Sequence, residues 1–285
     1  MGKIRRGSVF GFISCFVLAG LTAPAGHAMV QDQTCPDTVV LAARGSDQNE
    51  EYGEYFGPQL YSEHAEPSNG YEGPNFTALF HQVEQRYPGT MDRVYVLALD
   101  EKAYPANMDL PPLAEEGENI GLIELVQRAV GIVQQYPIHE MIHSVAFGFI
   151  DSVRSGMDNA PKVVENYEAT TGCNPNYVVA GFSQGALVTT SVEKYLANTG
   201  RLEGAVTIGN PLHKYPWAME RAALPEGKRV DYCLNGDFVC DFSLEATSDA
   251  LSTKAERHAS YFLNEPTAQD VRVIDAVAGL LNSVD

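Results

Sequence analysis

Five short runs of β-branched and apolar residues, each bounded by turn residues, constrain the fold more than any other feature. They are TVVLAAR (38–44), RVYVLAL (93–99), NYVVAGF (176–182), GAVTIGN (204–210) and RVDYCL (229–234). Apolar residues recur at helical spacing in segments 75–87, 151–169 and 186–200. The last of these segments ends on Gly200, a candidate C-terminal cap. Strands that alternate with helices predict a three-layer α/β/α sandwich around a mainly parallel sheet, with the functional site beyond the carboxyl ends of the strands.

The N-terminal segment has the pattern of a secretory signal peptide. Basic residues among the first six positions precede an apolar run at 9–21 and small residues up to Ala28. A membrane anchor is the alternative, but the run is shorter than the roughly 20 apolar residues of a spanning helix. A lipid-modified Cys15 is disfavoured by the residues before it. We expect a signal peptide at 1–28 and one domain at 29–285, because no linker or repeat divides the remainder.

Acidic residues outnumber basic ones throughout the chain. The 19 Lys and Arg residues face 37 Asp and Glu residues; removal of residues 1–28 takes away three basic residues and no acidic ones, so 16 minus 37 gives a charge of −21. Nucleic acid and anionic membranes repel such a chain. We expect a monomer that binds no nucleic acid and keeps no membrane span after signal cleavage.

Four cysteines remain after residues 1–28: Cys35, Cys173, Cys233 and Cys240. An even number in an oxidising compartment predicts disulfides, and three pairings are possible. The two cysteines of CLNGDFVC most simply close on each other, which leaves Cys35 to reach Cys173. A metal–thiolate site is disfavoured because the sequence contains no CxxC pair.

The segment GFSQGA (181–186) is a G-x-S-x-G nucleophile elbow between a predicted strand and a predicted helix. A serine hydroxyl needs a histidine to take its proton and a carboxylate to orient that histidine, in the chain order serine, acid, histidine. Only His213 and His258 follow Ser183, and His213 comes too soon after the fourth strand to leave an acid-bearing loop before it. His258 is preceded by Asp237, which lies in the loop between the last two cysteines; a simple turn residue is the alternative interpretation of Asp237.

Five segments resemble, in order, the cutinase family of serine esterases within the α/β-hydrolase fold. They are LAARGS after Cys35, GFSQGA after Cys173, GNPLH, YCLNGDFVC and HASY, and the resemblance extends over most of residues 35–263. The resemblance implies that Ser183 is the nucleophile, Asp237 the orienting acid and His258 the general base. It also implies the disulfides Cys35–Cys173 and Cys233–Cys240.

Two donors are expected for the oxyanion of the tetrahedral intermediate. The backbone N–H of Gln184, directly after the nucleophile, is one donor by elbow geometry. The family resemblance implies that Ser46, in ARGS, supplies the second through its N–H and hydroxyl. Without the resemblance, Ser46 would be interpreted as an ordinary cap residue.

A second motif, HEMIH (139–143), matches the pattern in which two histidines one helical turn apart bind zinc beside a glutamate base. Apolar spacing predicts a helix here, so the geometry allows a metal. A metalloprotease needs a third ligand, however, and Glu165 and Glu168 lie beyond Pro161 without a recognisable motif. We therefore expect no metal and no cofactor.

The segment at about 113–148 is where the chain departs from the family, because compact members lack these residues. Apolar residues are dense in it. One interpretation is a helical hairpin packed on the core. The other is a lid or wall that extends an acyl pocket, since exposed apolar helices beside an esterase cleft can receive long chains.

These features predict a secreted serine carboxylic ester hydrolase that cleaves lipid or polyester acyl esters through an acyl-enzyme on Ser183. The enzyme would be either released or held at the cell envelope. An acetyl (xylan) esterase and an acyltransferase with the same triad are alternatives, although Trp217 is the single tryptophan available for stacking on sugars. An envelope lipid-binding protein with a silent triad is the non-enzymatic alternative.

Overall fold

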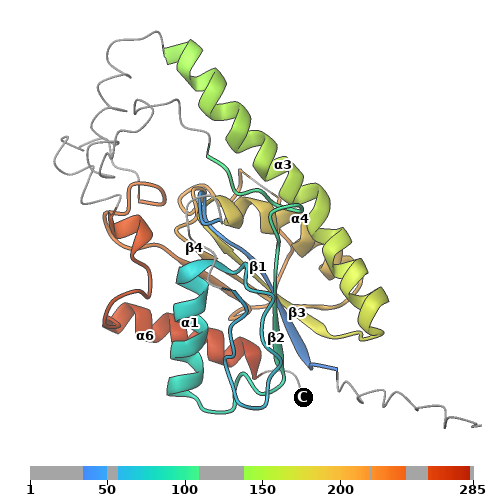
Figure 1. Ribbon diagram of the computed structural model, residues 1–285. Helices are drawn as coiled ribbons and strands as arrows, with labels where there is room; N and C mark the ends of the chain where they lie inside the picture. The colour runs from blue at the N-terminus through green and yellow to red at the C-terminus, as the bar shows by residue number, and fades with distance from the viewer. Residues whose placement is uncertain (1–34, 50–56, 109–137, 219, 242–255, 283–285) are drawn as a thin grey trace, which may run out of the picture. The chain divides into compact units, whose positions relative to one another are not determined.

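Five strands form one sheet in the order β2-β1-β3-β4-β5, and every neighbouring pair is parallel (Figure 1). The computed structural model describes residues 35–49, 57–108, 138–218, 220–241 and 256–282. The strands are β1 (Thr38–Ala43), β2 (Val94–Ala98), β3 (Asn176–Phe182), β4 (Leu202–Ile208) and β5 (Arg229–Tyr232). The predicted parallel sheet is confirmed, and the predicted strand ends shift by one or two residues at most.

Four helices flank these strands: α1 (Gly73–Arg86), α3 (Ile138–Thr171), α4 (Gln184–Asn198) and α6 (Ala268–Leu281). Beyond α4, Gly200 has a positive φ of 70°, the conformation for which a glycine after a helix end is favoured. The C-terminal helix α6 was not expected. It begins with a capping box, in which the Thr267 side chain accepts from the Asp270 N–H and the Asp270 side chain accepts from the Thr267 N–H.

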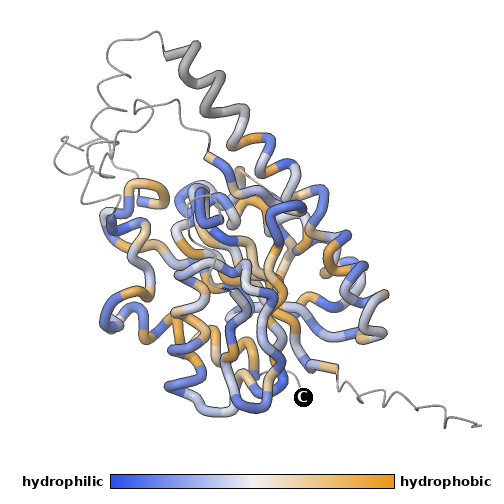
Figure 2. The backbone as a smooth tube through the Cα atoms, viewed as in Figure 1, coloured by the Kyte–Doolittle hydropathy of each residue, from blue (hydrophilic) through white to orange (hydrophobic). Residues whose placement is uncertain are grey.

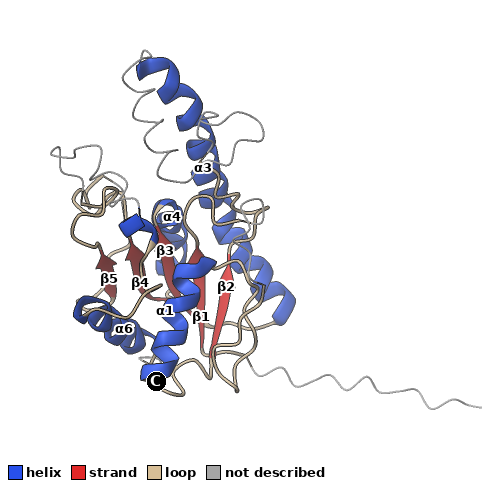
Figure 3. Cartoon of the chain, turned by 60° about the vertical axis from the view of Figure 1, so that its left-hand side comes forward, coloured by secondary structure: helices blue, strands red, loops and turns tan. Residues whose placement is uncertain are grey.

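The helices cover both faces of the sheet. Val40 and Ala42 of β1 point to the face where α1 and α6 contribute their apolar residues to one core, whereas Val39 and Leu41 point to a second core shared with α3 and α4. Figure 3 shows α1 and α6 in front of the sheet and α4 behind it, and Figure 2 shows hydrophobic residues along the strands. This alternation gives the predicted α/β/α sandwich.

Two disulfides join segments around the sheet. Cys35 and Cys173 precede the parallel strands β1 and β3, so their disulfide lies at the amino ends of the strands. Cys233 and Cys240 close the loop that follows β5, at the carboxyl ends. The second disulfide therefore shapes the sheet edge at which active sites of parallel α/β folds form.

Several sequence predictions lie outside the described residues. These include the whole signal segment 1–28 and residues 113–137 of the expected insertion. From residue 138 onward, the end of the insertion forms the first turns of α3, so the HEMIH segment is helical as predicted, while its side chains are not described. Within the described ranges, no helix combines the length and apolar character needed to cross a bilayer.

Candidate active site

Ser183 occupies a strained turn between β3 and α4. Its backbone has φ 53° and ψ −118°, a region that residues other than glycine rarely adopt. The Ser183 N–H donates to the carbonyl of Ile208, at the end of the neighbouring β4, over 2.9 Å. Such strained residues persist where the surroundings over-determine them, and they cluster at active sites. The predicted elbow therefore has the expected strand–turn–helix geometry.

Two glycines allow strand and helix to approach this closely. A Cβ on Gly181 would lie 2.6 Å from the Cα of Ala186, and a Cβ on Gly185 would lie 2.0 Å from the carbonyl oxygen of Ala43. Both obstacles are backbone atoms, which cannot rotate away. The first turn of α4 therefore packs directly on the carboxyl end of β1.

Gly185→Ala should destabilise the fold by at least about 3 kcal/mol. The added methyl group would overpack against backbone atoms, and the backbone would have to shift to make room. The matched control is Gly279→Ala in α6, where an added Cβ meets no atom within 4 Å. Alanine in a helix interior is favoured over glycine, so the control should gain about 0.5–1 kcal/mol. Denaturant unfolding of both variants measures the difference; equal stabilities would show that the tight contact at Gly185 does not matter.

Three side chains predicted from the sequence form a continuous hydrogen-bonded chain. His258 Nε2 lies 2.8 Å from Ser183 Oγ, and His258 Nδ1 lies 2.7 Å from Asp237 Oδ2. An ionised carboxylate only accepts hydrogen bonds, so Nδ1 carries the proton and Nε2 is free to accept from the Ser183 hydroxyl. In this tautomer the imidazole can act as a general base toward Ser183.

Aromatic side chains hold the His258 ring between β3 and the loop after β5. The ring stacks on Phe182 at a centroid distance of 5.2 Å and meets the edge of Phe238 at 5.7 Å. Asp237 is fully buried, Ser183 is 7% exposed and the His258 side chain is 14% exposed. The acid is thus shielded from water, while the serine and the base remain in reach of a substrate.

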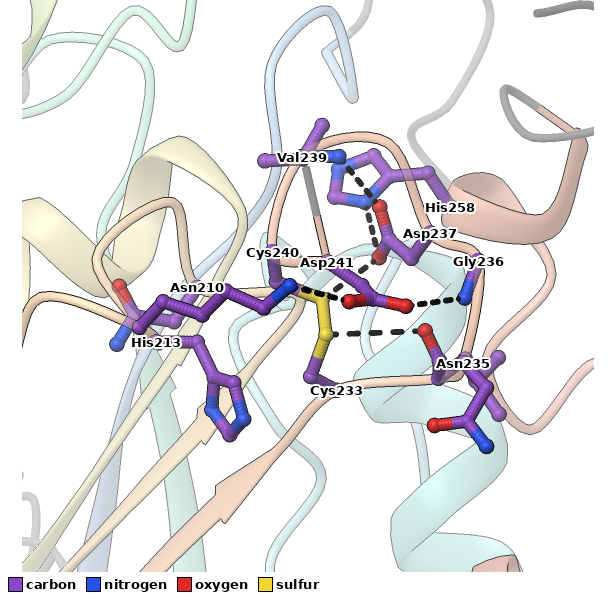
Figure 4. Close-up of a disulfide and its surroundings, with 12 residues drawn as sticks. Asn210, His213, Cys233, Asn235, Gly236, Asp237, Val239, Cys240, Asp241 and His258 are labelled. Atoms are coloured by element: carbon purple, nitrogen blue, oxygen red, sulfur yellow. Dashed lines mark hydrogen bonds and ion pairs between the residues drawn. A yellow bond between two sulfur atoms is a disulfide. The ribbon is translucent and has the colours of Figure 1, made fainter. Parts of the chain in front are cut away.

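The loop that carries Asp237 is fixed by several contacts. Figure 4 shows the Cys233–Cys240 disulfide and, on the loop that it closes, Asp237 facing His258. Asp241 accepts from the Gly236 N–H over 2.7 Å and forms an ion pair with Lys214, whose segment follows β4. The small disulfide loop is therefore also held against the segment that follows β4.

The electrostatic environment favours the ionised form of Asp237. Burial alone would raise the pKa of this carboxyl. Hydrogen bonds from His258, Tyr261 and the Val239 N–H outweigh burial, so the pKa lies below its usual value. Asp237 consequently stays charged across the neutral range, as the orienting acid of a serine nucleophile must.

Tyr261 is a site residue that the sequence did not single out. Its hydroxyl donates to Asp237 Oδ2 over 2.6 Å and accepts from the Leu234 N–H over 2.9 Å. Burial, followed by the nearby charge of Asp237, raises the pKa of the Tyr261 hydroxyl, which keeps it a donor. Asp237 Oδ2 therefore accepts from two donors, His258 and Tyr261.

Tyr261→Phe should raise the pH at which the Asp237 carboxyl protonates. The change removes a donor that lowers the pKa of Asp237, and the pH profile of the Asp237 carboxyl resonance in NMR spectra measures the shift. Tyr232→Phe is the matched control, because this buried tyrosine donates to Asp270, outside the triad. Superimposable profiles for Tyr261→Phe and the parent would contradict the expectation.

The two expected oxyanion donors lie at the carboxyl ends of neighbouring strands. β1 pairs with β3 in the register Ala43 to Gly181, which brings the turn holding Ser46 beside the start of α4. Gln184 is the first residue of α4, so its N–H has no acceptor within the helix. The Ser46 hydroxyl is buried and has no hydrogen-bond partner among the described residues.

The Gln184 side chain is itself fixed inside the protein. Its Oε1 accepts from Tyr104 over 2.8 Å and from Ser152 over 3.2 Å, and its Nε2 donates to the Asn107 carbonyl over 3.1 Å. This side chain is fully buried. The backbone N–H of Gln184 is thereby held in place by side-chain contacts as well as by the helix.

The remaining candidate residues have other partners. His213 Nδ1 lies 3.2 Å from Asp231 Oδ2, and Ser183 is hydrogen-bonded to His258 instead. Glu168, a candidate third zinc ligand, forms an ion pair with Arg201 and accepts from the Tyr177 hydroxyl. These contacts place the Glu168 side chain on the side of α3 that faces β3 and the residue preceding β4.

Comparison with known proteins gives the family. A family model described as Cutinase matches residues 114–274, a range that includes Ser183, Asp237 and His258. A comparison with curated proteins gave no match.

Similar solved structures include a Trichoderma reesei cutinase in complex with a phosphonate inhibitor, at 16% identity and a TM-score of 0.46, covering 87% of this chain and 78% of that one. They also include a cutinase-like protein from a Cryptococcus species, at 15% identity and a TM-score of 0.37, covering 87% of this chain and 97% of that one. The family model, however, spans more than half of the chain, and the protein therefore belongs to the cutinase family of serine carboxylic ester hydrolases.

Proposed function

We propose that the protein is a secreted esterase that cleaves lipid or polyester acyl esters with Ser183 as nucleophile, His258 as general base and Asp237 as orienting acid. The observation that carries the proposal is the unbroken chain of hydrogen bonds from Ser183 Oγ through His258 to Asp237. A buried, ionised acid and a strained nucleophile support it further.

The reaction follows from this arrangement. Ser183 Oγ attacks the ester carbonyl carbon while His258 Nε2 takes the hydroxyl proton, and the negative oxygen of the tetrahedral intermediate is held by the Gln184 N–H and by Ser46. The bond to the alcohol breaks as His258 returns the proton to the leaving oxygen. A water molecule then attacks the acyl-enzyme with His258 again as base, which releases the acid and restores Ser183.

Secretion and a single domain belong to the same proposal. Two disulfides, Cys35–Cys173 and Cys233–Cys240, support passage through an oxidising compartment. We propose cleavage after Ala28 and a catalytic domain at 29–285. N-terminal sequencing of the exported protein tests the cleavage site; an intact N-terminus at Met1 would contradict it.

An acetyl esterase on polysaccharide is a second candidate, favoured by one observation. Trp217 is 79% exposed and Tyr215 is 53% exposed, and the two rings pack edge to face at a centroid distance of 6.1 Å. They lie next to Lys214, which is paired with Asp241 of the acid loop. Exposed aromatic rings that adjoin a residue paired with the acid loop are suited to stacking on a sugar ring.

Hydrolysis of p-nitrophenyl esters from acetate to palmitate tests these proposals. The mature protein is assayed with chelator present throughout and with Ser183→Ala as the blank. We expect a Ser183-dependent rate that increases beyond acetate for a lipid or polyester esterase; a rate confined to acetate, together with release of acetate from acetylated xylan, would favour the second candidate. No rate above the blank at any length would contradict the hydrolase proposal and favour a transferase or a lipid-binding protein.

A further inference from the structure

Asn75 of α1 is a buried polar residue whose side chain contacts two loops of the active site. It is 1% exposed. Its Oδ1 accepts from Gln48 Nε2 over 2.6 Å, and its Nδ2 donates to the carbonyls of Ala259 and Tyr261, each over 2.9 Å. Both amide hydrogens and the amide oxygen are thus used. A fully satisfied buried polar group of this kind rigidifies the segments that it joins.

The Gln48 contact extends to the turn that carries Ser46. Gln48 Oε1 accepts from the Gly45 N–H over 2.9 Å, and Gly45 directly precedes Ser46. A Cβ on Gly45 would lie 2.7 Å from the ring of Phe182, the residue before Ser183. The turn therefore lies close against the strand that leads to Ser183, and the hydrogen bond from the Gly45 N–H to Gln48 fixes its orientation there.

The other contacts of Asn75 reach the segment of the general base. Ala259 directly follows His258, and Tyr261 donates to Asp237 Oδ2. Asn75 therefore holds the carbonyls on either side of Ser260, within three residues of the base. One side chain thus connects the oxyanion turn, through Gln48, with the loop that presents His258.

We infer that Asn75, acting through Gln48, is a positioning residue that sets the Ser46 turn and His258 relative to each other. This inference rests on the proposed function, in which Ser46 stabilises the oxyanion and His258 transfers the proton. Asn75 lies among buried core residues of α1, and its amide is used by Gln48, Ala259 and Tyr261, so its effect is on geometry rather than on chemistry. Reacting groups displaced by about 1 Å can lose roughly 100-fold in rate, whereas ground-state binding changes little.

The test compares Asn75→Ala and Gln48→Ala with Gln82→Ala. Gln82 is also on α1 and donates to the carbonyl of Phe262 over 2.7 Å. The control therefore removes a hydrogen bond from α1 to the segment after His258 without affecting the Ser46 turn. Rates are measured on the p-nitrophenyl ester that the parent hydrolyses fastest. The rates are divided by the concentration of active sites, which is determined by titration with a phosphonate that labels Ser183. Unfolded protein then does not lower the measured kcat.

Asn75→Ala should lower kcat by roughly 10- to 100-fold with KM within about twofold, and Gln82→Ala should leave kcat within about twofold. Gln48→Ala should lower kcat by a smaller factor, and the double variant should fall no further than Asn75→Ala, because the two residues act in series. An unchanged kcat for Asn75→Ala, an equal loss for Gln82→Ala, or losses that multiply in the double variant would overturn the inference.

If Asn75→Ala does not fold, Gln48→Ala decides the question, since Gln48 is only half-buried. A lower kcat at unchanged KM supports the inference, and an unchanged kcat overturns it. Failure of the proposed function is a separate outcome: the parent protein itself would then show no Ser183-dependent hydrolysis.

Discussion

Replacing Ser183 by alanine should lower kcat for ester hydrolysis by roughly 10⁴- to 10⁶-fold, the loss that follows removal of an acyl-enzyme nucleophile. The change removes the oxygen that His258 Nε2 faces at 2.8 Å, so no acyl-enzyme can form. The fold should survive, because the strained backbone at residue 183 is held by its N–H bond to Ile208 and by the close packing of α4 on β1. Steady-state hydrolysis with chelator present measures the loss.

Ser191→Ala is the matched control for this variant. Ser191 is a second serine of α4, and its hydroxyl donates to the carbonyl of Met157 in α3 over 2.8 Å. Its removal should change kcat by less than about twofold, as for substitutions away from the reacting groups. In a parallel assay without chelator, full activity of Ser183→Ala that added chelator abolishes would instead support metal chemistry at the HEMIH segment.

Asp237→Asn should lower kcat by roughly 10⁴-fold near neutral pH, as found when a triad acid becomes an amide and its histidine adopts the wrong tautomer. Asp237 Oδ2 accepts from His258 and Tyr261, and Oδ1 accepts from the Val239 N–H. An amide has only one acceptor oxygen, so its NH₂ group must face a donor on one of the two sides. Facing His258, the amide would favour the tautomer with the proton on Nε2, which cannot accept from Ser183.

Asp241→Asn tests whether any carboxylate of this loop has the same effect. Asp241 directly follows the loop closed by the Cys233–Cys240 disulfide, and it accepts from the Gly236 N–H and pairs with Lys214. The carboxylate that pairs with His258 Nδ1 is that of Asp237, so for Asp241→Asn we expect less than about a tenfold loss. Equal losses in Asp237→Asn and Asp241→Asn would mean that the loop conformation, and not the orienting carboxylate, controls the rate.

The elbow and the sheet could be predicted from the sequence because each is encoded locally. A strand needs only an apolar run with turn residues at its ends, and the elbow needs Gly181 and Gly185 at fixed spacing around Ser183. Asp237 and His258 could be predicted because the chain order serine, acid, histidine and the cysteine pair around Asp237 left few candidate acids and histidines after Ser183. α6 is also encoded locally, by the capping box of Thr267 and Asp270 and by the apolar spacing after it.

The contacts that position the triad could not be predicted in the same way. Asn75 and the carbonyl of Ala259 are separated by 184 residues, and Tyr261 and Asp237 by 24. No local pattern distinguishes a tyrosine that donates to a catalytic acid from one that donates to Asp270, as Tyr232 does. Such partners are set by the packing of α1 and the last loops against the sheet, which only the folded chain defines.

The most direct test of the account is to label the protein with a p-nitrophenyl phosphonate ester and locate the adduct by mass spectrometry. Attack by an activated serine would release p-nitrophenol and leave the phosphonyl group on the nucleophile. We predict one adduct, on Ser183, formed in proportion to the loss of esterase activity and absent from Ser183→Ala. Complete inactivation with Ser183 unlabelled, or an adduct on another residue that accounts for the inactivation, would contradict the assignment of Ser183 as nucleophile.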